Sequence, residues 1–127
     1  MPAVAGSQPV VTTSVPPTHR TLIVARMDPA DASAVARTFA ESDAGALPGL
    51  VGVTRRELFA FHGLYFHLID ALTDVAPAVA DVRDHPLFVD VNSKLERYIS
   101  AYDPQTWRGP RDAMARSFYQ WSAPTDA

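Results

Sequence analysis

Apolar and polar positions alternate most clearly over Thr54–Ala71, in the stretch TRRELFAFHGLYFHLIDA. The alternation predicts two strands joined by a tight turn at His62 and Gly63, because glycine at the second turn position allows the positive φ of a type I′ turn. A two-residue turn sets Phe61 opposite Leu64, and every later pair in the ladder follows from that register. A three-residue turn would shift the register and scramble the faces.

The two faces of this hairpin differ in character, since successive side chains of a strand point to opposite sides. One face is mixed, with a guanidinium, a phenol and an imidazole among aliphatic groups: Arg56, Leu58, Ala60, Tyr65, His67 and Ile69. The other is a block of large apolar groups with charges at its outer end: Arg55, Glu57, Phe59, Phe61, Leu64, Phe66, Leu68 and Asp70. We expect helices to cover the mixed face, where chemistry is to be sought, and a second copy of the chain to cover the apolar one.

The remaining segments complete a β-α-β-β-α-β order. Thr18–Met27 is apolar on both faces at its centre, as in a strand inside a covered sheet. Asp28 is a good N-cap for a helix expected to run to about Ala44. The later segments are a helical region capped by Thr73 or Asp74, a helix from Pro86 to Tyr102 and a final strand over Met114–Ser122. This order predicts an α+β protein with the ferredoxin-like fold.

Composition narrows the class of protein. A chain of 127 residues with 47% apolar and 20% charged residues is typical of one soluble globular domain. The net charge of −3 gives no footprint for nucleic acid, and the absence of cysteine excludes disulfides and thiolate metal sites. We expect residues 1–17, which are rich in proline and small polar groups, to be a disordered leader, and residues 18–127 to form the domain. Neither a membrane span nor a signal peptide is recognisable, so the expected location is the cytoplasm.

Two residues of the mixed face are candidates for chemistry. His67 could serve as a general acid and base, although a histidine that is merely packed and hydrogen-bonded in the core remains an alternative. Arg56 lies diagonally across the ladder and needs an acceptor, which Asp43 at the end of the first helix or a ligand oxygen could supply. Tyr65 could donate a hydrogen bond to a carbonyl group, or simply pack against its neighbours. The histidines lack the spacing of a metal site, and no nucleotide-binding or hydrolase motif is present.

Five blocks in order resemble the small aromatic polyketide cyclases of the tetracenomycin cyclase family over about His19–Pro124. They are ARMDPADA (Ala25–Ala32), FAESD (Phe39–Asp43), FAFHGLYFHLI (Phe59–Ile69), HPLFVDVN (His85–Asn92) and FYQWSAP (Phe118–Pro124). The resemblance implies a homodimeric ferredoxin-like protein of the dimeric α/β barrel type. It also implies aldol cyclisation and dehydration of a partly cyclised poly-β-ketone, in antibiotic or spore-pigment biosynthesis, without metal or organic cofactor.

The same resemblance points to site residues. Asp43, Arg56 and His67 fall on catalytic positions of the family's cavity. The expected substrate-binding residues are Ser42, Leu58, Tyr65, Ile69 and Asn92. Ser42 departs from the family pattern, which has a histidine before the aspartate, so one possible acid–base group is missing.

Two other functions stay open at this stage. A cofactor-independent monooxygenase of the same dimeric architecture would also act on enolisable aromatic compounds, and fold alone does not separate the two activities. A non-catalytic accessory subunit of a polyketide synthase is the second alternative. The substrate could be free or tethered to a carrier protein.

Overall fold

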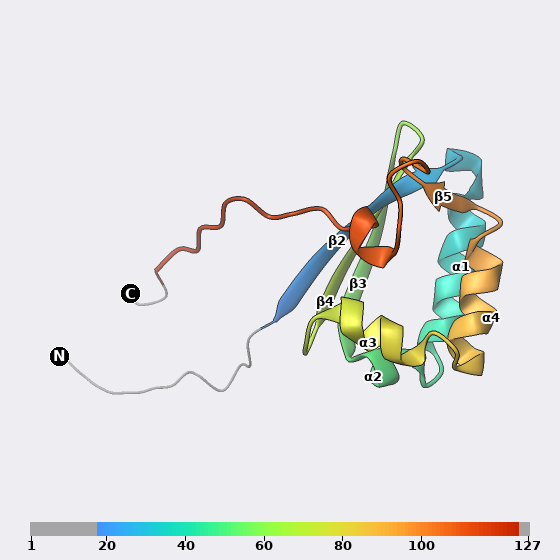
Figure 1. Cartoon of the computed structure of the whole chain (residues 1–127), viewed down its shortest axis with the longest axis horizontal. Helices are drawn as coiled ribbons and strands as arrows, with labels where there is room; N and C mark the ends of the chain where they lie inside the picture. The colour runs from blue at the N-terminus through green and yellow to red at the C-terminus, as the bar shows by residue number, and fades with distance from the viewer. Residues whose placement is uncertain (1–17, 125–127) are drawn as a thin grey trace.

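A four-stranded antiparallel sheet forms the centre of the computed structural model, which describes residues 18–124 (Figure 1). Its strands are β2 (His19–Met27), β3 (Val53–Phe61), β4 (Leu64–Ala71) and β5 (Ile99–Ala101). They lie in the order β3-β4-β2-β5, so the first strand of the chain is central and the two strands of the hairpin form one side. This topology agrees with the predicted ferredoxin-like fold. The predicted leader, residues 1–17, lies outside the described residues.

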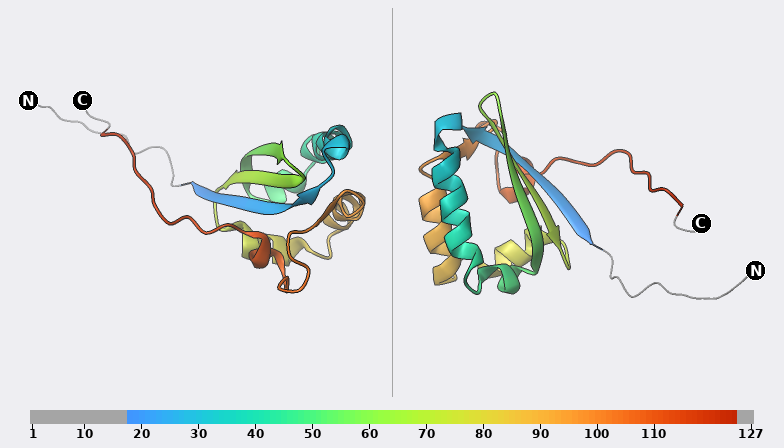
Figure 2. Two further views of the ribbon diagram at one scale, coloured as in Figure 1. Left: turned by 90° about the horizontal axis from the view of Figure 1, so that it is seen from above. Right: turned by 180° about the vertical axis from the view of Figure 1, so that it is seen from behind.

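The two longest helices, α1 (Ala32–Asp43) and α4 (Pro86–Leu95), lie side by side over one face of the sheet (Figures 1 and 2). The short helices α2 (Leu47–Val51) and α3 (Val75–Val82) lie near one end of it. Two single turns of 3-10 helix, η2 (Pro29–Asp31) and η3 (Pro110–Ala113), complete the elements. None of the helices in residues 18–124 is long and apolar enough to span a bilayer.

Side-chain caps start several helices where the sequence predicted them. Asp28 accepts a hydrogen bond from the Ala30 N–H at the start of η2, and Asp74 accepts one from the Ala76 N–H at the start of α3. At α4 the cap is the imidazole of His85, whose Nδ1 accepts from the Leu87 N–H at 3.1 Å. His85 therefore has a structural role in the local backbone.

The hairpin has the predicted register. Phe61 pairs with Leu64, Leu58 with His67 and Arg56 with Ile69. The turn residues His62 and Gly63 both have positive φ, 48° and 78°, as a type I′ turn requires. A register irregularity between Val53 and Arg55 marks the start of β3.

Two hydrophobic clusters fill the space between the sheet and the helices. One contains Leu47, Val51, Ile69, Ala71, Val75 and Val91. The other contains Ala25, Met27, Val35, Phe39 and Tyr65. The mixed face of the hairpin is therefore the covered face, as predicted, and Tyr65, His67 and Ile69 are all buried.

The C-terminal part of the chain differs from the prediction in two ways. The predicted helix to Tyr102 ends at Leu95, and the fourth strand is β5, which pairs with Ala25–Met27 of β2. The predicted strand over Met114–Ser122 was wrong: only Met114 forms a bridge, to Ile23, and after the hydrogen bond from the Ala115 N–H to the Leu22 carbonyl oxygen the described chain pairs with no strand. Apolar residues at 95, 98, 99 and 102 suit both a helix and a turn into a strand, so periodicity alone could not choose between them.

The other face of the sheet is free of helices (Figure 2). We call its apolar part the open face, comprising Leu22, Val24, Phe59, Phe61, Leu64, Phe66 and Leu68. Phe59 and Phe61 are 44% and 61% exposed, whereas the other five are half-buried.

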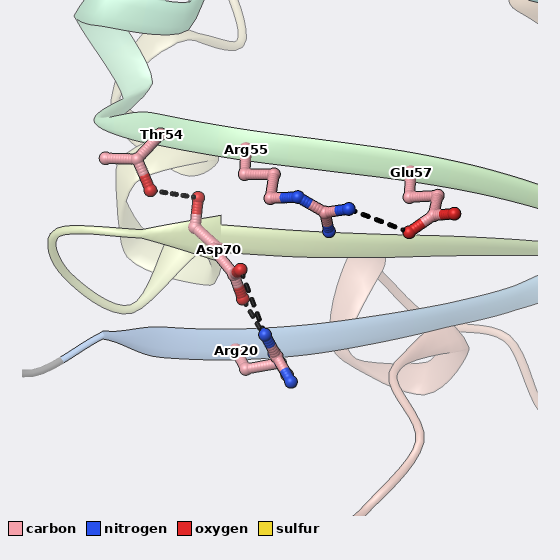
Figure 3. A network of polar contacts seen from close by, with 5 residues as sticks. All are labelled: Arg20, Thr54, Arg55, Glu57 and Asp70. Carbon is pink, nitrogen blue, oxygen red and sulfur yellow. Dashed lines mark hydrogen bonds and ion pairs between the residues drawn. The ribbon is translucent and has the colours of Figure 1, made fainter.

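Charged groups border the open face at the end far from the turn (Figure 3). Arg20 donates from Nε and Nη2 to the two carboxylate oxygens of Asp70, at 2.7 and 3.1 Å, and Arg55 donates to Glu57 at 3.0 Å. The hydrogen bond from Arg20 is the main reason why the pKa of Asp70 lies below its usual value. The ion pairs therefore mark one limit of the apolar surface.

Candidate functional site

Three polar side chains from three different elements form a continuous chain on the covered side of the sheet. Arg56 of β3 donates from Nη2 to Asp43 Oδ1 at 2.8 Å and from Nε to Asp43 Oδ2 at 2.9 Å. Its Nη1 lies 2.9 Å from Nε2 of His67 on β4. Asp43 is the last residue of α1, so the end of this helix fixes the carboxylate beside the hairpin. The structure thus brings together all three predicted catalytic residues.

The contact with Arg56 defines the protonation of His67. A guanidinium can only donate hydrogen bonds, so Nε2 must be the acceptor and the proton of the neutral ring lies on Nδ1. Burial is the main reason why the pKa of His67 falls to about 3, and the nearby charge of Arg56 lowers it further. At neutral pH the imidazole is therefore uncharged and a weak base.

The guanidinium of Arg56 has more hydrogen-bond donors than it uses within the described residues. Arginine has five N–H groups, of which one on Nε and one on Nη2 point to Asp43 and one on Nη1 points to His67. One N–H on each terminal nitrogen remains without a partner among the described residues. The side chain of Arg56 is 16% exposed, so most of it is shielded from water, although its contact with Asp43 lies at the surface.

Phe39 holds this group in place and was not singled out as a site residue from the sequence. The guanidinium carbon of Arg56 lies 4.8 Å from the centre of the Phe39 ring, and the His67 ring meets Phe39 edge-on at 5.0 Å. The aromatic face therefore stabilises the cation while the ring blocks water. Its position on the apolar stripe of α1, one turn before Asp43, was the available signal.

Tyr65 lies next to His67 and contributes a buried hydroxyl group. The two rings are 6.1 Å apart, and Tyr65 is 3% exposed. Its hydroxyl has no hydrogen-bond partner among residues 18–124, and burial raises its pKa, so the phenol stays protonated at neutral pH. A buried donor without a partner is costly unless another molecule supplies an acceptor.

A cavity of about 160 Å³ lies next to Tyr65. Its lining is mainly apolar and includes Met27, Val35, Ala36, Leu58 and Tyr65. This volume is below the roughly 300 Å³ at which typical ligand pockets begin, so an aromatic polyketide could place only part of its body there.

The other predicted substrate-binding residues do not line this cavity. Ser42 lines a separate cavity of about 130 Å³ between α1 and α4, together with Glu41, Asp90 and Lys94. Ile69 packs in the hydrophobic cluster that contains Leu47 and Val91. Asn92 is exposed on α4, and its amide donates to Glu96 at 3.3 Å. Of the five, Leu58, Tyr65 and Ile69 therefore adjoin the group formed by Asp43, Arg56 and His67, since Ile69 is the cross-strand partner of Arg56.

Metal-binding geometry is missing from the part of the chain that the structure describes. Within residues 18–124, no group of three or more histidine, aspartate or glutamate side chains could hold an ion. The described site consists instead of an arginine, a carboxylate, a neutral imidazole and a phenol.

Comparison with known proteins gives consistent matches over nearly all the described residues. The family model for polyketide synthesis cyclases matches residues 19–122. An uncharacterised protein of Streptomyces coelicolor is 59% identical over 104 residues, which are 81% of this chain and 94% of that protein. The polyketide synthase CurG of Streptomyces cyaneus is 54% identical over 103 residues, covering 81% of this chain and 96% of its own.

Tetracenomycin F2 cyclase of Streptomyces glaucescens is similar in both sequence and structure. It is 48% identical over 106 residues, which are 84% of this chain and 96% of that enzyme. Its solved structure, described as that of a type-II polyketide cyclase, superimposes with a TM-score of 0.78 and is covered to 99%.

Proposed function

The chain belongs to the polyketide synthesis cyclase family, and on that basis we propose that it closes a ring in a partly cyclised aromatic poly-β-ketone by aldol addition followed by loss of water. The observation that supports this most is the guanidinium of Arg56, which Asp43 and His67 fix with two N–H donors unused, and which Tyr65 separates from an apolar cavity. In aldol addition an enolate carbon attacks a ketone, so negative charge moves from one oxygen to another. Donors held in a dry site stabilise such oxygens most strongly.

Arg56 is the proposed electrostatic centre of the reaction. Asp43 binds the Nε edge in a two-oxygen contact and so orients the plane of the guanidinium. The free N–H groups would meet the enolate or alkoxide oxygen of the substrate. This role needs the cation in one orientation, which explains why two partners and the Phe39 ring hold it.

His67 is proposed to orient Arg56 and to assist, without being indispensable. A pKa of about 3 makes the imidazole a poor proton acceptor at neutral pH, whereas the methylene between two carbonyl groups is already acidic and needs only a modest base. Ser42 precedes Asp43 in this chain, where the resemblance to the tetracenomycin cyclase pattern implies a histidine. Both features favour a site that mainly holds its substrate in the geometry for ring closure, since orientation alone can account for several kcal/mol of the barrier.

Tyr65 is proposed to hold a carbonyl of the substrate. Its hydroxyl remains a donor at neutral pH and faces no acceptor from the described residues. With Leu58 it borders the cavity, so it could fix the end of the polyketide that enters there.

We further propose that the reaction needs neither metal nor organic cofactor, so that chelation should leave turnover unchanged.

The proposed working form is a homodimer in the cytoplasm, joined through the open face. The support is physical: the exposed rings of Phe59 and Phe61 adjoin five further apolar side chains, and no helix of the described chain covers them. We place the enzyme in antibiotic or spore-pigment biosynthesis, with a substrate that is free or tethered to a carrier protein.

The test is to incubate the purified protein with partly cyclised polyketides of several chain lengths and identify products by mass and NMR. The expected result is a new ring with loss of one water, formed faster than in buffer. The matched control is Arg97→Ala, which removes an exposed arginine outside the site. Oxygen consumption with an oxidised product would instead establish a monooxygenase, and unchanged substrate across the series would contradict the proposed cyclisation.

A further inference from the structure

We propose that the cavity between α1 and α4 binds one uncharged hydroxylated aromatic ring, the ring that the partly cyclised substrate already carries. The inference rests on the cyclisation proposed above and gives its substrate a second binding site. We call this space the α1–α4 cavity. It lies on a different side of α1 from the cavity next to Tyr65, because different residues of the helix line the two.

The α1–α4 cavity has the size and floor that suit a single aromatic ring. An apolar cavity of about 150 Å³ inside a protein can hold benzene, and this one has a volume of about 130 Å³. Leu47 of α2 and Val91 of α4, both buried, line it together with the partly exposed Leu87. One six-membered ring therefore fits between the helices, whereas two fused rings do not.

The rim of the α1–α4 cavity, formed by Glu41, Ser42, Asp90 and Lys94, offers both donors and acceptors. Lys94 Nζ lies 3.0 Å from Asp90 Oδ2, and Glu41 adds a second carboxylate from α1. Ser42 is half-buried, and its hydroxyl makes no hydrogen bond to another residue within 18–124. A phenol hydroxyl both donates and accepts, so it can use the carboxylates and also the ammonium or the serine hydroxyl.

The charge of the rim selects against an acidic ring. Its two carboxylates outnumber the single ammonium of Lys94, which Asp90 already pairs. A ring that carries a carboxylate would meet repulsion from Glu41 and compete with Asp90 for the same cation. A neutral ring with hydroxyl groups avoids both penalties, and the first ring of an aromatic polyketide has this chemistry.

The α1–α4 cavity and the group around Arg56 meet at the same end of α1. Ser42 and Asp43 are consecutive in the last turn of this helix, and the Asp43 side chain, which holds Arg56, is 35% exposed. A substrate whose finished ring occupies the cavity can therefore lie across the end of α1, with its open chain directed to Arg56. Fixing the ring restricts the rotation of that chain and favours one ring closure over others.

The first measurement uses Lys94 as a reporter, because it is the only lysine in the chain. Reductive methylation with ¹³C-formaldehyde keeps its charge and gives one side-chain NMR signal, besides that of the α-amino group. Resorcinol should shift this signal saturably, at a concentration at least about 10-fold lower than benzoate. No saturable shift, or equal binding of benzoate, would overturn the proposal.

Variants of Ser42 show whether the probe enters the cavity or only touches the lysine. Ser42→Leu fills the space and should abolish the shift, whereas Ser42→Ala keeps the space and should weaken binding by about 5-fold through the lost hydrogen bond. The matched control is Ser93→Leu, at an exposed position of α4 outside the cavity, which should bind resorcinol as the native chain does. Unweakened binding in Ser42→Ala would overturn the proposal even if Ser42→Leu fails to fold.

The second measurement follows the reaction with a partly cyclised polyketide. Ser42→Leu leaves the contacts of Arg56 in place, so it should raise KM by about 10-fold with a smaller change in kcat, and it should increase wrongly closed rings. Ser93→Leu should match the native chain in both. A native KM and product ratio in Ser42→Leu would show that the substrate places its ring elsewhere and would overturn the proposal.

The outcomes separate this site from the cyclisation on which it rests. If the native chain closes no ring in any substrate, the proposed function fails, although the resorcinol titration still reports whether the cavity binds a ring. If the native chain closes rings while resorcinol produces no saturable shift, only the α1–α4 cavity proposal fails.

Discussion

Burial decides the charge of His67, and that charge decides what the residue can do. The imidazole is 6% exposed and touches Phe39, Tyr65 and a cation, so its charged form is disfavoured and its pKa falls to about 3. A histidine with this pKa is an acceptor for Arg56 and not a proton carrier at neutral pH. The sequence identified the residue and its face, but not its charge state, because that depends on packing from α1.

The same burial predicts a pH dependence of stability. Unfolded His67 binds a proton below about pH 6.5, whereas the folded form binds one only near pH 3. In this window the unfolded state holds more protons, so the free energy of unfolding should fall as pH decreases, by up to about 1.4 kcal/mol per pH unit. Urea unfolding between pH 7 and 5 measures this slope.

The matched variants isolate the source of that slope. His67→Gln offers an oxygen to Arg56 but does not titrate, so its free energy of unfolding should lack the decrease between pH 7 and 5 that His67 causes. His62→Asn removes an exposed turn histidine and keeps a residue that tolerates positive φ, so its free energy of unfolding should still show that decrease. Equal slopes in all three proteins would show that His67 titrates normally in the folded state.

At the scale of elements, the hairpin carries most of the site. Its register places Arg56 and His67 on neighbouring strands, and α1 brings Asp43 and Phe39 to them. The turn residues alone allowed this register to be predicted, because a type I′ turn leaves one alignment. The C-terminal strand was predicted wrongly because Phe118, Tyr119 and Trp121 have strand-like composition but no neighbouring strand in their own chain.

Gly63 should therefore be sensitive to substitution. Its φ of +78° disfavours any side chain, although a Cβ there would meet no atom within 4 Å. Gly63→Ala should reduce the free energy of unfolding by about 1 kcal/mol through backbone strain alone. Gly49→Ala is the control, since it lies in α2 with an open surrounding and should leave stability equal or slightly higher. Denaturant unfolding of both variants compares them, and equal effects would refute the turn argument.

At the scale of the whole molecule, the sheet separates two tasks. Its helix-covered face holds the polar site, and its open face, which no helix of the described chain covers, is the face through which we propose that two copies assemble. The pattern of the hairpin predicted this division, because only one face contained ionisable groups at its centre. The need of Arg56 for an acceptor suggested Asp43, whereas only the resemblance suggested Ser42 and Asn92. The packing of α1 and α4 showed that, of these three, Asp43 contacts Arg56.

Assembly through the open face is testable by charge. Phe59→Asp combined with Phe66→Asp would place carboxylates in the proposed dry interface, so we expect a monomer or an aggregate in sedimentation analysis. Asp81→Asn with Asp84→Asn, two exposed positions outside the sheet, controls for altered charge. A double aspartate variant that stays a native dimer would show that the open face is not the interface.

The central claim is that Arg56 stabilises the oxygen that becomes negative as the ring closes. The most direct measurement is the rate and ring selectivity of the purified enzyme with Arg56→Ala, Arg56→Lys and His67→Gln, each shown to be folded. We expect Arg56→Ala to lower kcat by about 10²–10³, Arg56→Lys to recover part of it, and His67→Gln to lose less than either, with wrongly closed rings increasing in parallel. Wild-type rate and selectivity in Arg56→Ala would contradict this account of the site.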